Sequence, residues 1–381
     1  MNCRLQGCLR RVALAGALAV SSAGCWDLRT LDQRAFALLM AIDRQEGQWQ
    51  LTAQIAVPGG QDRGGGAEGT PAAIELVSGR GNSLREALDD LRSRLHRELD
   101  TSHMDTVVIG EAAAREGLDR LLFLSRSLRV PVVASVAVSR GPAAEVTRAR
   151  SPALNLPALF TARAFTGSFT RHPGVIPVPV WMLFNRLLPS PFQDPYAPGL
   201  VSREGQIDFA GVALFSGPRM VGWLDGHDAA TLGVIRARRV VGSVSADVPA
   251  QDGQPGGRTV LRVVTGRIRY SADLRDGRPV LRLNASFHGD LDEAPPGLLR
   301  DAQGQARVEQ ALARESEARL ESLLHRLQEI GSDPIGFGED FRVRWPDSPF
   351  VRDKASWQAA YRQAEVEARV DISITSSGHR E

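Results

Sequence analysis

The residue with the most specific chemistry in this sequence is Cys25, a thiol at the end of an N-terminal apolar run. Arginines open the chain, the run Val12 to Val20 is uninterrupted by polar residues, and the small residues 22–24 close it. Basic, then apolar, then small is the order of a secretory signal. The run is too short to cross a hydrocarbon core of about 30 Å, which takes roughly 20 residues. We therefore expect residues 1–24 to be a signal peptide.

The position of Cys25 has two interpretations. In the first, a diacylglyceryl group is attached to the thiol and the chain is cut just before it, which leaves Cys25 as a lipidated N-terminus. In the second, an ordinary signal peptide has a cysteine near its end by chance. Ala23 and Gly24 favour the first because a peptidase must approach the backbone there, whereas Ser22 departs from the usual aliphatic residue. We predict Cys25 as the lipid-attachment residue.

No other residue pattern predicts chemistry. Cys3 and Cys8 lie inside the signal, so the mature chain has neither a disulfide nor a cysteine-based metal site. The motifs HExxH, GxSxG and SxxK are absent, and the seven histidines lack metal-ligand spacing. His227 and Asp228 are neighbours, but consecutive side chains on a strand point in different directions, which disfavours general-base work. We predict no catalytic residue, metal or cofactor, and a protein that is not an enzyme.

Length and composition indicate a folded protein of two or more domains. The chain has 381 residues, 43% of them hydrophobic and 24% charged, which are ordinary values for a folded chain. The net charge of +2 implies no field toward nucleic acid.

Residues 25–200 are predicted to form an N-terminal α+β domain. The stretches 35–42 and 49–57 read as an antiparallel strand pair close to the membrane surface, because little chain separates them from Cys25. Ser83 and Glu86 form a capping box before a helix with leucines at helical spacing. The further elements are expected to be strands at 74–78, 103–110 and 130–138 and helices at 111–127 and 143–148.

A proline-rich stretch, residues 151–199, separates the two halves of the chain. One interpretation is a long connection with one or two short helices that cover the core. The other is a partner-facing surface, because prolines and exposed aromatic residues suit a rigid interface. Under both interpretations, the change of composition along the chain predicts a domain boundary near residue 200.

Residues 201–381 are predicted to form a C-terminal α+β domain with room for a further subdivision. A Ser216-Gly217-Pro218 turn predicts a hairpin of strands 207–215 and 220–224. The remaining elements are expected to be helices at 229–235, 303–330 and 356–364, strands at 259–268, 280–288 and 366–374, and a glycine-rich segment at 333–345. The whole is a multi-domain α+β fold with mixed or antiparallel sheets packed by helices.

Five spaced motifs resemble one known family. They are Gly24-Cys25-Trp26-Asp27, FALLMAID at 36–43, WQLTAQIAVP at 49–58, GVALFSGPRMVGWLD at 211–225, and the segment 333–378 with DPIGFGEDFRVRWP, Trp357 and VEARVDISITSSG. These motifs are similar to those of the Ger(x)C lipoproteins, the C subunits of spore-germination nutrient receptors. Ala41 stands where the family often has glycine. In the last segment, Gly336 and Gly338 allow turns around Phe337, which can fill the core, and Trp357 is expected to be a buried anchor.

The resemblance implies a lipoprotein on the outer face of the inner spore membrane. It implies a receptor subunit that acts in germination with membrane-embedded A and B subunits and is held to the membrane by lipid. The alternative is a solute-binding lipoprotein that itself captures a small nutrient, which needs a hinged cleft with convergent polar groups. Two halves of unrelated topology without such a cleft would favour the receptor subunit.

Overall fold

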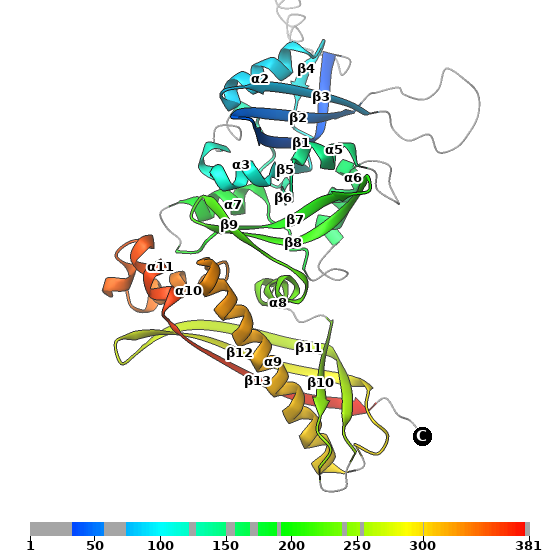
Figure 1. Ribbon diagram of the computed structural model, residues 1–381, viewed down its shortest axis with the longest axis vertical. Coiled ribbons are helices and arrows are strands. Elements are labelled where there is room, and N and C mark those ends of the chain that lie inside the picture. The colour runs from blue at the N-terminus through cyan, green and yellow to red at the C-terminus, as the bar shows by residue number, and fades with distance from the viewer. Residues whose placement is uncertain are drawn as a thin grey trace, which may run out of the picture.

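The computed structural model describes residues 33–56, 74–121, 127–149, 157–167, 174–188, 192–237, 242–251, 255–299 and 301–377. Cys25 and the predicted signal peptide lie outside these residues. Figure 1 shows an elongated molecule in which two sheets, each with its own helices, follow one another along the long axis. Among the described residues, no helix is both long and apolar enough to cross a membrane.

The first sheet has nine strands in the described part of the chain. Their order is β3-β2-β1-β5-β6-β7-β8-β9, with β4 beside β1. The strands are β1 (Arg34–Gln45), β2 (Gln48–Ala56), β3 (Ile74–Gly81), β4 (Glu98–Asp100), β5 (Thr106–Gly110), β6 (Ser135–Ser139), β7 (Tyr196–Arg203), β8 (Gln206–Ser216) and β9 (Arg219–Leu224). The pairings β1–β4, β1–β5, β5–β6 and β6–β7 are parallel, and the pairings β1–β2, β2–β3, β7–β8 and β8–β9 are antiparallel. The predicted antiparallel pair is confirmed as β1 and β2.

Short helices cover this sheet. They are α2 (Leu84–Ser93), α3 (Glu111–Glu116), α5 (Ala143–Arg148), α6 (Pro157–Gly167), α7 (Val180–Leu187) and α8 (Gly226–Ala237). The capping box of α2 is confirmed, because the Glu86 amide donates to Ser83 Oγ at 3.2 Å and the Glu86 carboxylate accepts from the Asn82 amide at 3.0 Å. Leu84, Leu88 and Leu91 bury the inner face of this helix.

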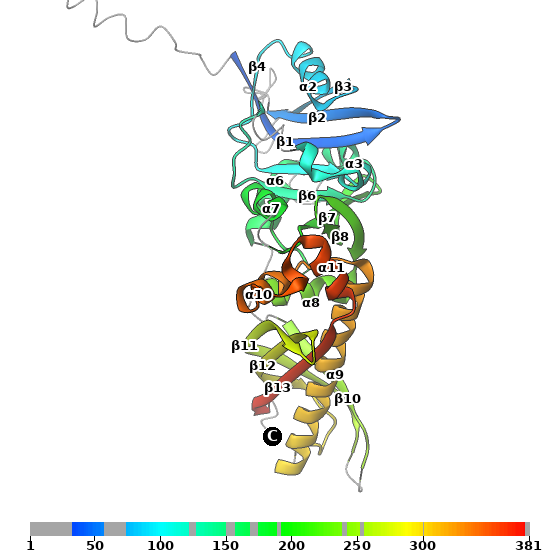
Figure 2. The same ribbon diagram turned by 90° about the vertical axis from the view of Figure 1, so that its left-hand side faces the viewer.

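The second sheet has four described strands in the order β10-β11-β12-β13, and the long helix α9 (Ala302–Ile330) crosses it diagonally (Figures 1 and 2). The strands are β10 (Gly242–Val248), β11 (Gly257–Arg275), β12 (Arg278–Glu293) and β13 (Glu365–Ser377). The last pair, β12–β13, is parallel and the others are antiparallel. The two sheets therefore differ in size and topology, and both mix parallel with antiparallel pairing, as the α+β expectation has it.

Two predicted elements are shorter than expected, and one segment contains a helix that the sequence did not predict. The helix predicted at 111–127 ends at Glu116, because Gly117 adopts φ +141°. The strand predicted at 130–138 begins only at Ser135, after a turn at residues 131–134. The segment 333–345, predicted only as a glycine-rich stretch, contains the helix α10 (Phe337–Arg344). The helix predicted at 356–364 is α11 (Lys354–Arg362).

The first sheet continues beyond the boundary predicted from the sequence. Residue 200 lies inside β7, and the antiparallel strands β8 and β9 extend the same sheet to Leu224. The division of the chain into domains 25–200 and 201–381 stays a prediction.

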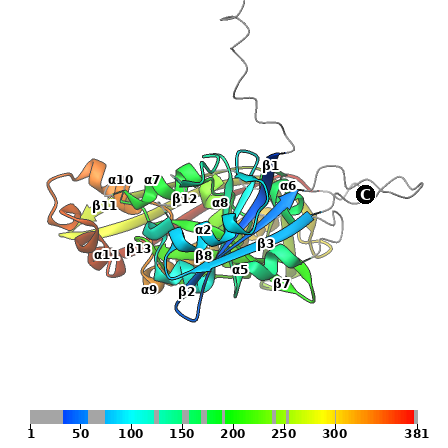
Figure 3. The same ribbon diagram turned by 90° about the horizontal axis from the view of Figure 1, so that it is seen from above.

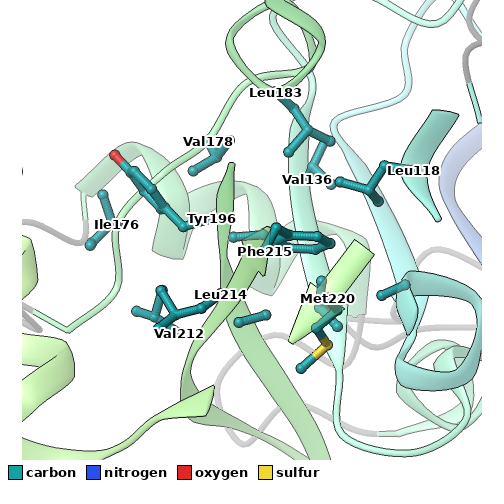
Figure 4. Close-up of a cluster of buried hydrophobic side chains, with 14 of the residues drawn as sticks. Leu118, Val136, Ile176, Val178, Leu183, Tyr196, Val212, Leu214, Phe215 and Met220 are labelled. Atoms are coloured by element: carbon teal, nitrogen blue, oxygen red, sulfur yellow. The ribbon is translucent and has the colours of Figure 1, made fainter. Parts of the chain in front are cut away.

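The largest described core cluster runs through both sheets. Figure 4 shows its part beside the junction, where Phe215 of β8 packs among Leu118, Val136 and Met220. In the same view the ring of Tyr196 lies beside Ile176 and its hydroxyl points away from Phe215. The same cluster includes Leu281 of β12 and Phe337 of α10, so apolar packing is continuous from the first sheet to the second.

Candidate functional site at the junction of the two sheets

The centre of the junction is the carboxylate of Asp333, which folds its own turn. Asp333 Oδ1 accepts hydrogen bonds from the amides of Gly336 at 2.8 Å and Phe337 at 3.1 Å. Asp333 Oδ2 accepts from the amide of Gly338 at 2.7 Å and from Trp357 Nε1 at 3.2 Å. Four N–H donors thus satisfy a side chain that is 2% exposed. This turn lies between α9 and α10.

A second buried carboxylate, Asp194, joins this turn to the first sheet. Asp194 Oδ2 accepts from the Asp333 amide at 2.9 Å, and the Asp194 amide donates to the Asp333 carbonyl at 3.0 Å. Asp194 Oδ1 accepts from the amide of Gly217, in the hairpin turn between β8 and β9, at 2.9 Å. Ser332 Oγ adds a bond to the Phe215 carbonyl at 2.6 Å. We call this set of bonds around Asp194 and Asp333 the junction clasp.

Helix α10 connects the clasp to the second sheet. Asp340 Oδ2 accepts from the amide of Ala272 on β11 at 2.8 Å. Phe337, fully buried, meets the ring of Tyr270 on β11 with centroids 5.6 Å apart. The short segment 332–340 therefore contacts both sheets directly, and its displacement would be felt by each.

The expectations for the residues of this motif are confirmed. Gly336 adopts φ +96° and precedes the first turn of α10, a conformation that favours glycine. Gly338 is required for a different reason, because a Cβ there would lie 2.4 Å from Trp357 Nε1 and 2.7 Å from the Phe192 carbonyl. Trp357 is 3% exposed and anchors α11 on the clasp.

Burial dominates the electrostatics of the clasp. It raises the pKa of Asp333 to about 6; the amides of Gly338 and Gly336 act in the opposite direction, and the neighbouring Asp194 raises it further. Burial also raises the pKa of Asp194, against the amides that donate to it. Nearby, burial raises the pKa of the Tyr361 phenol well above its usual value, and among the described residues this hydroxyl has no hydrogen-bond partner. Two buried carboxyl groups at one junction are an unusual concentration of charge.

A cationic cluster lies beside the clasp. The guanidinium of Arg186, on α7, stacks 4.3 Å from the ring centroid of Tyr196. Arg236, on α8, donates to Tyr196 Oη at 3.1 Å and to the Ile335 carbonyl at 2.9 Å. Burial raises the pKa of Tyr196, but the two arginines outweigh it and the net direction is down. Arg186 is 3% exposed, and burial lowers its pKa. The cluster connects helices of the first sheet to the turn that holds Asp333.

Together with α10, the clasp contacts both sheets and can therefore transmit a displacement between them. The clasp carboxylates are enclosed by N–H donors and face no cavity among the described pockets. The described residues contain no group of three side chains that could hold a metal ion. His227 and Asp228, the neighbouring pair noted in the sequence, lie at the beginning of α8, and Cys25 lies outside the described residues.

A polar groove lies between the first sheet and α9, next to the junction. It has a volume of about 670 Å³ and is lined by Trp223, Asp225 and Asp228 on one side and by Glu321, His325 and Glu329 of α9 on the other. Its walls are mostly polar and carry more acidic than basic groups. Glu321 is already engaged, because its carboxylate accepts from the Ala368 amide at 3.2 Å.

Sequence reasoning found one half of this site and missed the other. The motif around Asp333 was noticed through its glycines and aromatic residues. No sequence pattern points to Asp194, Arg186 or Arg236, because each lies in or after the proline-rich stretch with no periodic pattern around it. Tyr196 stands out only as one of the aromatic residues of that stretch. Their proximity to Asp333 arises from tertiary structure alone.

Comparison with known proteins agrees with this architecture. Residues 27–202 match the family model for the spore germination protein N-terminal domain, and residues 210–378 match the model for the C-terminal domain of spore germination B3/GerAC-like proteins. The spore germination protein KC of Bacillus subtilis is 25% identical over 94% of this chain and 93% of its own. The spore germination protein B3 of the same species is 22% identical over 93% and 94% of the two chains.

A solved structure shows the same fold. The crystal structure of the GerBC protein superposes with a TM-score of 0.55 at 16% identity and covers 88% of this chain and 96% of that one. The matched family models meet between residues 202 and 210, close to the boundary predicted from the sequence, although the first sheet continues past it. With both domain models matched in order and the fold in agreement, the chain belongs to the Ger(x)C family of spore germination proteins.

Proposed function

We propose that this protein is the lipid-anchored C subunit of a nutrient germinant receptor. The thiol of Cys25 carries the lipid, and the protein lies on the outer face of the inner spore membrane with membrane-embedded A and B subunits. Its role is to couple these partners structurally, not to catalyse a reaction. The observation that carries the proposal is the junction clasp, a rigid and buried connection between two sheets in a chain that matches spore germination proteins over both halves.

Coupling requires that a force on one sheet reaches the other. A junction made only of apolar contacts could slide, whereas the clasp fixes Asp194 and Asp333 through directional bonds on both sides. Lys354 adds a further tie, because its Nζ donates to the carbonyls of Arg186 and Leu188 at the end of α7. These contacts support a body that moves as a unit and passes a partner's displacement along its length.

The alternative, a lipoprotein that captures a nutrient itself, is favoured by one observation, the polar groove beside α9. A hinged cleft would have to open at the junction, and the clasp opposes that motion. Isothermal titration of the mature chain with amino acids and sugars separates the two proposals. Saturable micromolar binding that Asp228→Asn weakens would favour the nutrient-binding protein.

The first test is crosslinking in spores together with membrane fractionation. Capture of an A or B subunit, lost with nutrient-triggered germination in a deletion strain, is expected. A protein that captures neither subunit while germination proceeds normally without it would refute the receptor role.

Lipid attachment has its own test. Cys25→Ala is expected to leave the fold intact and to release the protein from membranes or block its maturation, because no acyl chain then holds it. The matched control is Cys8→Ala, inside the predicted signal peptide, which should fractionate with membranes as the parent does. A Cys25→Ala protein that stays in the membrane fraction would show that the anchor lies elsewhere.

A further inference from the structure

An apolar patch on the first sheet has no partner among the described residues. Val132 and Val133, in the turn before β6, are 62% and 74% exposed, and Trp181 and Leu188 of the α7 region are 50% and 53% exposed. The Trp181 amide donates to the Val132 carbonyl at 3.1 Å, so the two segments are adjacent. Trp181 is in the first turn of α7, and Leu188 is the extended residue that directly follows the last turn of this helix. We call these four residues the α7 patch.

The α7 patch is mounted rigidly. The Val180 amide donates to the Ala134 carbonyl at 2.9 Å, and Pro179 forms a bridge with Ser135 at the start of β6. Val180 and Leu183 are buried on the inner side of the same helix. Large apolar side chains held outward by a fixed backbone are typical of a surface that meets another body.

The topology places the α7 patch on the side where the chain arrives from Cys25. Leu39 of β1 pairs in parallel with Thr106 of β5, and Thr106 pairs with Ser135 of β6, so the beginnings of these strands share one edge. Figures 2 and 3 agree that the start of β1 and α7 lie on the same side of the molecule. Five residue steps from Arg34 to Leu39 and two strand spacings place Ser135, which follows the turn of the patch, about 20 Å from the start of β1.

The length of chain before β1 limits where a lipid at Cys25 can be. Eight residues lie between Cys25 and Arg34, and the nine residue steps that join them span at most about 30 Å when the chain is fully extended. A bilayer that holds the lipid therefore passes within about 30 Å of the start of β1, a distance comparable to that from β1 to the α7 patch. Trp suits the membrane–water interface because its ring is apolar and its N–H is polar.

We propose that the α7 patch inserts into the interfacial region of the membrane that holds the lipid of Cys25. The inference rests on the proposed lipid anchor and adds a second contact, which orients the first sheet on the bilayer. Residues of both charges lie near the patch: Arg129 lies three positions before Val132, the Asp105 carbonyl accepts from the Ser135 amide, and Lys354 Nζ donates to the Leu188 carbonyl. Insertion is therefore driven mainly by apolar area.

The test uses the mature chain with Cys25→Ser, which carries no lipid, and co-sedimentation with phosphatidylcholine vesicles. Val133→Asp and Trp181→Asp should each lower the vesicle-bound fraction by roughly fivefold or more, because a charge then enters the interface. Val264→Asp is the matched control, since Val264 on β11 is 56% exposed and lies on the second sheet; it should bind as the parent does. About a quarter of phosphatidylglycerol in the vesicles should change parent binding by less than roughly threefold.

A brominated phosphatidylcholine supplies a second measurement. It should quench part of the tryptophan fluorescence of the parent, and Trp181→Phe should remove that quenching. Equal vesicle binding by the parent and Trp181→Asp, or no binding by either, overturns the proposal. The proposal is also overturned if Trp181→Asp leaves vesicle binding unchanged but abolishes a crosslink to the A or B subunit, or a dimer seen in sedimentation equilibrium. Mass spectrometry of Cys25 in the spore protein tests the lipid anchor separately, because the vesicle assay uses unlipidated chain.

Discussion

Carboxylates accept backbone N–H bonds at two places in this molecule, with different burial. At the junction clasp, Asp194 and Asp333 are enclosed and join two sheets. On α9, Glu309, Glu317 and Glu321 accept from the amides of Ile374, Val370 and Ala368, respectively, along the outer edge of β13. The first arrangement holds the molecule together at one buried point, whereas the second protects the edge of a sheet at several half-exposed points.

The comparison shows how burial sets the energetic weight of one type of bond. Water can replace a lost glutamate at the edge of β13, but it cannot reach the donors around Asp333. Unsatisfied buried donors retain their full desolvation cost, so the clasp should be far more sensitive to substitution than the edge.

The largest effect is expected for Asp333→Ala. The change leaves four N–H donors without their acceptor in a buried site, and we expect a loss of roughly 3–5 kcal/mol in the free energy of unfolding. Asp353→Ala, which removes the exposed N-cap of α11, is the matched control and should cost about 1 kcal/mol. Denaturant unfolding of both variants measures the difference; equal losses would mean that the clasp carries no special weight.

The pH dependence of the free energy of unfolding tests the protonation of the Asp333 carboxyl group. The pKa of Asp333 is raised from 3.8 to about 6 in the folded protein, so between these values the folded state binds a proton that the unfolded state has released. The contribution of this group to stability is therefore complete below about pH 3.8 and is lost as the pH rises to about 6. The full span corresponds to about 3 kcal/mol.

Asp333→Asn isolates this contribution from the other carboxylates. Asp90, Asp100 and Glu339 have lowered pKa values and stabilise the fold in the opposite direction, at higher pH. The difference in unfolding free energy between the parent and Asp333→Asn should thus change across pH 4 to 6, with the parent losing relative stability as the pH rises. A difference that stays constant over this range would contradict the raised pKa.

Gly338→Ala is expected to have the next largest effect. The added Cβ would meet Trp357 Nε1 and the Phe192 carbonyl, both fixed, and overpacking of this kind costs about 2 kcal/mol. Gly205→Ala is the control, because Gly205 has φ +75° with nothing within 4 Å of its Cβ position, so only backbone strain of about 1 kcal/mol applies. Thermal unfolding should rank Gly338→Ala below Gly205→Ala in Tm; the reverse order would show that the clasp tolerates a shift.

Local patterns predicted the elements well and the junction poorly. The capping box of α2, the hairpin of β8 and β9 and the whole of α9 are encoded in neighbouring residues, and all three are confirmed. The helix α10 was not predicted because glycines such as Gly336 and Gly338 are typical of loops. In the structure Gly336 precedes the helix, and Gly338 is inside it because a Cβ there would clash with Trp357. Asp194 lies 139 residues from Asp333, and no periodicity relates them. A contact between such residues depends on how the two sheets pack, which short-range patterns do not encode.

The edge of β13 is expected to give the smallest effect and so sharpens the comparison. Glu317→Gln keeps a neutral acceptor for the Val370 amide, while Glu317→Ala removes the acceptor from a half-buried position. A single hydrogen bond that water can partly replace contributes about 1 kcal/mol, so Glu317→Ala should cost about that much and Glu317→Gln less. Hydrogen exchange of the Val370 amide measures the local effect. Faster exchange in Glu317→Ala, with exchange at the clasp amides of Gly336 and Gly338 unchanged, is the expected result. Faster exchange at both places would mean that the edge and the clasp open together, and that the difference in burial does not separate them.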